Sequence, residues 1–78
     1  MPKIPAVTGK EAVRVFERAG FVCVRISSSH HIMKRAGCVH NLSIPVHAGK
    51  TLGKGLLKSQ IAAAGMTVED FIAYLEIT

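Results

Sequence analysis

Residues 21–35 constrain the fold of this chain more than any other stretch. Two short runs rich in β-forming residues, 21–26 and 30–35, flank three consecutive serines, Ser27, Ser28 and Ser29. Serine hydroxyls can hydrogen-bond to nearby backbone in place of a strand partner, so they favour a turn at this point. The stretch therefore predicts two strands, over residues 21–26 and 30–35, that pair as an antiparallel hairpin.

Two adjacent histidines, His30 and His31, open the second predicted strand. Neighbouring residues on a strand point to opposite faces of the sheet, so one of these side chains must lie on the face that is not packed. Histidine is the side chain that most readily takes up or releases a proton near neutral pH. If this protein carries out chemistry, we expect it at this pair.

Helices are predicted on both sides of the hairpin. Thr8 and Glu11 have the spacing of a capping box, and apolar residues follow at helical intervals over residues 9–19. A second helix is expected over about 55–64, where Leu57, Ile61 and Ala64 recur at helical spacing. A third is expected from Thr67 onwards, because threonine is a favoured N-cap.

Alternating side chains over residues 38–46 predict a third strand, joined to the second by a tight turn at residues 36–37. Pro45 argues that this strand is an edge strand or ends there. The order α-β-β-β-α-α predicts a single α+β domain over residues 1–78, with one three-stranded antiparallel sheet covered by helices on one face.

Strict alternation in the first strand would put Cys23 and Arg25 on one face of the sheet and the apolar residues around them on the other. Cys23 and Cys38 fit neither a disulfide framework nor a CxxC pattern. We interpret both as reduced thiols that behave as small hydrophobic residues.

The charge distribution favours a polyanionic partner. Ten Lys and Arg against five Asp and Glu give a formal net charge of +5, and the basic residues extend from Lys3 to Lys58. Nucleic acid is the first candidate and an acidic protein the second. No apolar run approaches the roughly 20 residues that span a bilayer, and no signal-peptide pattern follows Met1, so we expect a cytoplasmic protein without membrane contact.

These features together resemble the HicA family of toxin ribonucleases. The likeness covers most of the chain and is carried by residues 28–32, 45–50, 55–61 and 64–71. The family pattern at the second strand is glycine, serine, any residue and histidine. Ser28 stands at the glycine position in this chain, and the family's catalytic histidine corresponds to His31.

The resemblance implies a fold similar to that of double-stranded-RNA-binding domains. It also implies an endoribonuclease that cuts messenger RNA independently of the ribosome, and a HicB-like antitoxin that neutralises it. We expect this antitoxin to be acidic and to cover the face that bears His31.

The chemistry of RNA cleavage assigns further roles. RNA supplies its own nucleophile, the 2′-hydroxyl, so the protein must move protons and stabilise charge on the phosphate, with no obligatory metal or cofactor. A positioned histidine contributes about 10²–10⁴-fold as acid or base, which is the role predicted for His31. Cations stabilise the added phosphate charge, and the predicted RNA contacts are Lys34, Arg35, Lys50, Lys54 and Lys58. Possible supporting residues are Ser29, His30 and His47.

Other readings of the same residues have less support. Adjacent histidines on opposite faces cannot bind one metal ion without bending the strand, and no spacing matches the usual zinc patterns. The glycine-rich loop over residues 49–55 lacks the residue order of a nucleotide-binding loop. The first alternative to a ribonuclease is a non-catalytic RNA-binding module of the same fold. The second is a protein-interaction domain whose charge only aids solubility.

Overall fold

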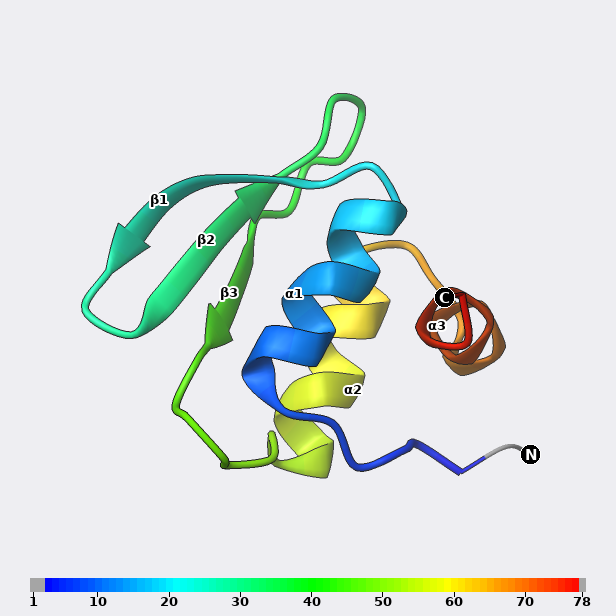
Figure 1. The fold of residues 1–78 in the computed structure, drawn as a ribbon. Coiled ribbons are helices and arrows are strands. Elements are labelled where there is room, and N and C mark those ends of the chain that lie inside the picture. The colour runs from blue at the N-terminus through cyan, green and yellow to red at the C-terminus, as the bar shows by residue number, and fades with distance from the viewer. Residues whose placement is uncertain (1–2, 78) are drawn as a thin grey trace.

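The structure is a computed structural model that describes residues 3–77. Three strands form an antiparallel sheet in the order β1-β2-β3 within these residues, and three helices accompany it (Figure 1). The predicted α+β class and the order α-β-β-β-α-α are confirmed. The elements are α1 (Gly9–Arg18), β1 (Val22–Ser27), β2 (His30–Lys34), β3 (Leu42–Pro45), α2 (Lys54–Ala63) and α3 (Val68–Leu75).

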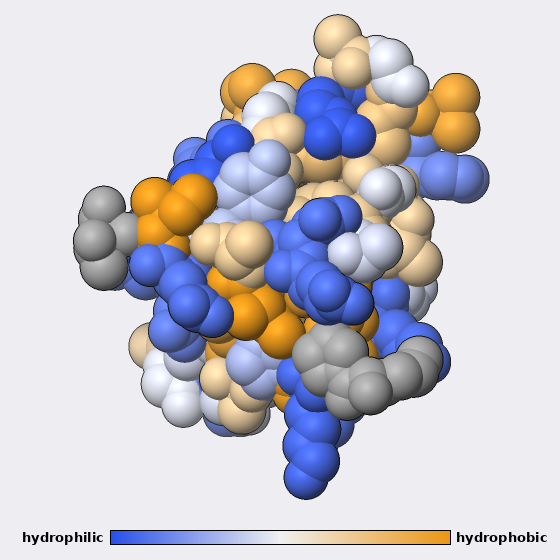
Figure 2. Space-filling view, turned by 90° about the vertical axis from the view of Figure 1, so that its right-hand side faces the viewer, coloured by the Kyte–Doolittle hydropathy of each residue, from blue (hydrophilic) through white to orange (hydrophobic). Residues whose placement is uncertain are grey.

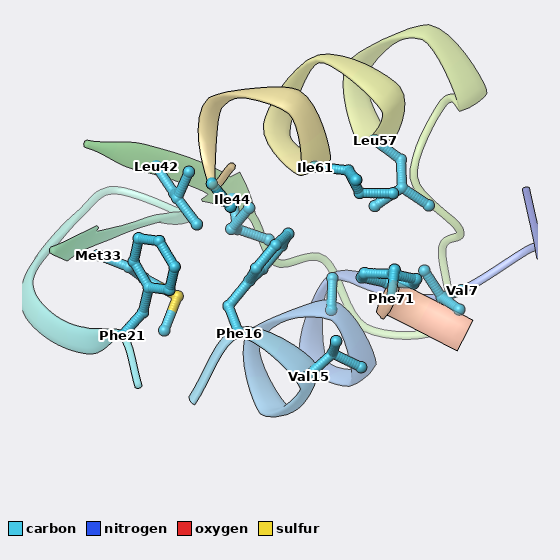
Figure 3. Packing of buried hydrophobic residues seen from close by; sticks show 12 residues of the cluster. Val7, Val15, Phe16, Phe21, Met33, Leu42, Ile44, Leu57, Ile61 and Phe71 are labelled. Carbon is cyan, nitrogen blue, oxygen red and sulfur yellow. The ribbon is translucent and has the colours of Figure 1, made fainter. Parts of the chain in front are cut away.

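The helices lie on one side of the sheet in two layers. Helices α1 and α2 pack against the strands, and α3 packs on these two helices on the side away from the sheet (Figure 1). Phe16 of α1 lies in the middle of the core, with Phe21 towards the sheet and Phe71 towards α3 (Figure 3). The ring centroids of Phe21 and Phe71 lie 6.0 and 5.6 Å from that of Phe16. All three rings are buried, so apolar burial joins the layers.

Capping boxes begin two of the three helices. The N–H of Glu11 donates to the Thr8 hydroxyl at 3.2 Å, and the Glu11 carboxylate accepts from the Thr8 N–H at 2.9 Å. Thr67 and Asp70 repeat this arrangement at the start of α3. The caps predicted at Thr8 and Thr67 are therefore confirmed. Helix α2 differs, because it begins after Gly53 with no side-chain cap and no acidic residue in its first turn.

The third strand is shorter than its alternating pattern predicts. The prediction is wrong for residues 38–41 and for residue 46, because β3 covers only Leu42–Pro45. After the turn at residues 36–37 the chain leaves the sheet, and the thiol of Cys38 donates to the carbonyl of Ala63 in α2 at 3.5 Å. A long loop rather than a tight turn therefore joins β2 to β3. Pro45 ends this edge strand, as its missing N–H predicts.

A β-bulge in β1 overturns the strict alternation predicted for that strand. Cys23 pairs with Met33, whereas Arg25 pairs with Ile32, so Val24 is an extra residue in β1. Residues directly opposite on antiparallel strands share a face of the sheet. Met33 is buried under the helices, so Cys23 lies on the helix-covered face and Arg25 lies on the open face with Ile32.

Gly9 determines how α1 meets the sheet. A Cβ atom here would collide with the Pro45 carbonyl oxygen and would lie 2.9 Å from the Cα of Val46. Glycine therefore allows the helix to begin directly against the end of β3. Since Pro45 pairs with His30, this contact also holds the start of α1 at the end of the sheet where β2 begins.

Candidate functional site

His31 is the second residue of β2 and lies at the margin of the core. Its ladder partners are Ile26 on β1 and Ile44 on β3, which places it on the helix-covered face. Ile44 is fully buried, whereas Ile26 is 60% exposed. The β1–β2 hairpin extends away from the helices at this point (Figure 1), so the imidazole of His31 is only partly buried.

A cysteine thiol contacts one nitrogen of this imidazole. The Cys23 sulfur lies 3.8 Å from Nδ1 of His31 and 3.6 Å from the carbonyl oxygen of Arg25. The thiol has a single proton to donate. When that proton goes to the Arg25 carbonyl, the sulfur accepts from the Nδ1–H group and leaves the lone pair of Nε2 free. In either tautomer Nδ1 faces the sulfur, so Nε2 is the nitrogen that we expect to meet a substrate.

Ser29 and His47 join the hairpin turn to the segment after β3. The Ser29 hydroxyl oxygen lies 3.3 Å from Nε2 of His47, and the Ser29 carbonyl accepts from the Val46 N–H at 2.8 Å. His30 is exposed and lies on the open face, opposite His31, because the two are neighbours on one strand. Two of the three supporting candidates are thus in contact, and the third faces away from His31.

Lys34 does not lie with His31. It is three residues further along β2, which places it on the open face, where it lines a hollow together with Arg25 and Ile32. A phosphate held at the helix-covered face would therefore lie on the opposite side of the sheet from the Lys34 side chain. The RNA contact of Lys34 stays a prediction, and on this face it would be separate from His31.

Arg35 is engaged within the fold. Its guanidinium donates to the carbonyl oxygens of Ala19 at 3.0 Å and Ala64 at 3.2 Å, which are the C-caps of α1 and α2. Its Cζ atom also lies 4.7 Å from the ring centroid of Phe21, a cation–π distance. Both terminal nitrogens of the guanidinium donate hydrogen bonds, so Arg35 connects the C-terminal ends of α1 and α2 to the end of β2. Its RNA contact also stays a prediction, and it would compete with these internal contacts.

The three remaining predicted cations surround the start of α2 and are called here the basic cluster: Lys50, Lys54 and Lys58. All three are exposed, with Lys50 in the preceding loop and the other two one turn apart on the helix. Helix α2 has neither a capping side chain nor an acidic residue in its first turn. Its first N–H groups and the positive end of its dipole are therefore not offset by the helix's own side chains. The start of β2, the end of β3 and the first turns of α1 and α2 lie at the same end of the molecule (Figure 1).

Cys23 is the site residue that sequence interpretation missed. As a lone thiol in an apolar strand it carries no motif, and its place beside His31 depends on the bulge at Val24. Cys23 and Cys38 are both free thiols. Across residues 3–77, no three His, Cys, Asp or Glu side chains gather as metal ligands would, and no helix is long and apolar enough to cross a bilayer.

The chain matches the model of a known protein family. A family model described as the HicA toxin of bacterial toxin-antitoxin matches residues 9–66. The match begins at the first residue of α1 and continues past the end of α2, so it includes the whole sheet, His31 and the basic cluster. A search of the curated proteins finds no match.

Proposed function

The chain belongs to the HicA family of bacterial toxins, and from that premise we propose that it is an endoribonuclease that cleaves messenger RNA without a metal ion or cofactor. The observation that supports this most directly is the position of His31. Its imidazole is partly exposed at the end of the sheet, with Nδ1 beside the Cys23 sulfur and Nε2 left for a substrate.

In the proposed reaction His31 moves the proton. Its Nε2 atom takes the proton of the RNA 2′-hydroxyl, and the 2′-oxygen attacks the adjacent phosphorus. The bond from phosphorus to the 5′-oxygen then breaks, leaving a 2′,3′-cyclic phosphate and a 5′-hydroxyl end, and the imidazolium returns the proton to the leaving oxygen. Acid–base catalysis by one positioned side chain accounts for about 10²–10⁴-fold of the rate.

The basic cluster is the proposed contact with the RNA backbone. Lys50, Lys54 and Lys58 are exposed, and the unpaired N–H groups expected at the start of α2 favour a phosphate oxygen. No acidic residue lies between Arg18 and Val68, so repulsion of the phosphates is small over this part of the chain. Three phosphate contacts to single-stranded RNA predict a slope of about −2 for log affinity against log salt.

The toxin is proposed to act in the cytoplasm, where messenger RNA is found. Its family implies an antitoxin partner. We propose that this partner is an acidic, HicB-like protein that covers the face bearing His31 and so keeps RNA away from the imidazole.

The decisive experiment compares His31→Ala with His40→Ala. His40 is exposed in the loop before β3, so its substitution controls for the loss of an imidazole elsewhere. Purified proteins are incubated with single-stranded RNA in excess EDTA, and folding is checked by urea unfolding. We expect wild type and His40→Ala to cleave alike, and His31→Ala to be slower by about 10² or more.

Two outcomes would contradict the proposal. If folded His31→Ala cleaves like wild type, His31 is not the proton-transfer group. If wild type binds RNA with steep salt dependence but never cleaves it, the alternative of a non-catalytic RNA-binding module holds.

A further inference from the structure

The open face of the sheet carries an exposed surface that the proposed reaction does not use. Val22 and Val24 are 62% and 54% exposed there, although valine is a residue type usually found buried. An open hollow lies beside them, lined by both apolar and cationic side chains. We call this surface the open-face patch; it consists of Val22, Val24, Arg25, Ile32, Lys34 and Asn41.

The open-face patch combines exposed apolar side chains with two cations. Apolar residues that gather on one exposed face are a feature of binding surfaces, and cations beside them can pair with the charges of a partner. The side of the molecule over α3 shows hydrophobic areas that hydrophilic residues separate (Figure 2). Burying the open-face patch would remove the exposed surface of Val22 and Val24 from water, which favours binding.

The charges of the patch identify the kind of partner. Arg25 and Lys34 both line the hollow, and the chain has no acidic residue from position 19 to position 67 that could pair with them. A second copy of this chain would bring like charges together, which opposes self-association. RNA would satisfy the cations but leave the valines without apolar contact, because the patch has no aromatic side chain for base stacking.

We infer that the open-face patch is an anchoring surface for the antitoxin, separate from the face that bears His31. The antitoxin would place a carboxylate in the hollow between Arg25 and Lys34 and pack apolar side chains on Val22 and Val24. This inference rests on the toxin function proposed above, because a toxin of that kind must bind its antitoxin.

The partner docks on the face of the sheet rather than along its edge. β1 is an edge strand, but the bulge at Val24 interrupts its ladder, and Arg25 follows directly. Bulges and charged residues are the devices by which edge strands avoid pairing with another chain. A strand added to β1 would meet this interruption, whereas a surface laid over the open face would not.

The test measures antitoxin affinity and RNA cleavage on the same set of variants. Arg25→Glu reverses one charge of the patch, and Arg14→Glu makes the identical change on the exposed side of α1. Val24→Asp removes apolar surface from the patch. The probe is the purified HicB-like antitoxin proposed above, and its dissociation constant is measured by titration calorimetry. Urea unfolding confirms that each variant is folded.

We expect Arg25→Glu and Val24→Asp to raise the dissociation constant at least tenfold, since charge reversal and loss of an apolar contact at an interface centre are each costly. Arg14→Glu should stay within about twofold of wild type, because a change far from the interface leaves its contacts intact. RNA cleavage by Arg25→Glu should match that of Arg14→Glu, since both lower the net charge equally.

Three results would overturn the inference. Unchanged antitoxin binding by Arg25→Glu would show that the patch is not the anchor, and an equal loss in Arg14→Glu would show an effect of net charge alone. Loss of RNA cleavage in Arg25→Glu with intact antitoxin binding would assign the patch to RNA. Failure of wild type to cleave RNA would refute the proposed function, yet the comparison of dissociation constants would still decide whether the patch holds the antitoxin.

Discussion

The sulfur of Cys23 and the Nδ1 atom of His31 lie 3.8 Å apart on the helix-covered face of the sheet. This contact depends on the bulge in β1. Counting back from the hairpin without a bulge, Val24 would pair with Met33, and Cys23 would lie on the open face. The extra residue moves Cys23 to the position opposite Met33, on the same face as His31. A local irregularity of the strand therefore provides the neighbour of the proposed catalytic group.

We predict that Cys23→Ala slows RNA cleavage while leaving the fold intact. Without the sulfur the imidazole of His31 loses a partner on Nδ1, so both its orientation and its tautomer are less restricted. A hydrogen bond of about 1 kcal/mol corresponds to about a fivefold loss in kcat. Cys38→Ala is the matched control, because Cys38 is an equally half-buried thiol that contacts Ala63 instead. Equal activities of the two variants would show that the thiol does not position His31.

We predict that Arg35 contributes to stability rather than to RNA affinity. Arg35→Ala removes two hydrogen bonds to helix C-caps and the contact with Phe21, and should lower the free energy of unfolding by about 2–3 kcal/mol. Lys34→Ala, at the exposed neighbouring position, should change it by less than about 0.5 kcal/mol. Urea unfolding of both variants measures the difference. A stable Arg35→Ala protein with weakened RNA binding would instead favour a phosphate contact.

The helices could be predicted from the sequence because their signals are local. Thr8 with Glu11 and Thr67 with Asp70 are each complete within four residues, and both capping boxes are present. Apolar spacing likewise indicated buried positions such as Phe16 in α1, Leu57 in α2 and Phe71 in α3.

The details of the sheet could not be predicted because they depend on distant contacts. The residues from position 38 to 41 alternate like a strand, but the chain there follows the contact of Cys38 with α2 instead of pairing with β2. No glycine or proline near Val24 indicates the bulge in the sequence. Arg35 and Lys34 are adjacent cations in the sequence, and only the packed structure shows that Arg35 is half-buried and hydrogen-bonded to two helix ends whereas Lys34 is exposed.

We predict that Glu11 makes stability depend on pH in the acid range. Hydrogen bonds from the backbone N–H and then the hydroxyl of Thr8 lower the pKa of the Glu11 carboxyl below its ordinary value. A group whose pKa is lower in the folded protein stabilises the fold above its unfolded pKa, and this contribution is lost as pH falls through the folded pKa. Stability should therefore decline below about pH 4 more steeply in wild type than in Glu11→Gln.

Urea unfolding from pH 7 down to the acid range tests this expectation. Thr8→Ala keeps the backbone donor but loses the hydroxyl, so it should retain part of the pH dependence that Glu11→Gln lacks. Parallel curves for wild type and Glu11→Gln would mean that the capping box does not respond to protonation.

The turn between β1 and β2 offers a stabilising substitution. Ser28 has φ 57° and is the non-glycine residue with positive φ among residues 3–77. A two-residue hairpin turn with positive φ at its first central position favours glycine there, which is the residue of the family pattern. A side chain at this position is strained, so Ser28→Gly should raise the free energy of unfolding by about 0.5–1 kcal/mol.

The neighbouring substitution Ser29→Gly should lower stability, because Ser29 has no such strain and its hydroxyl contacts His47. RNA cleavage by Ser28→Gly should equal that of wild type, since the substitution keeps the turn that places His31 at the start of β2. Urea midpoints that rank Ser29→Gly above Ser28→Gly would contradict this account of the turn.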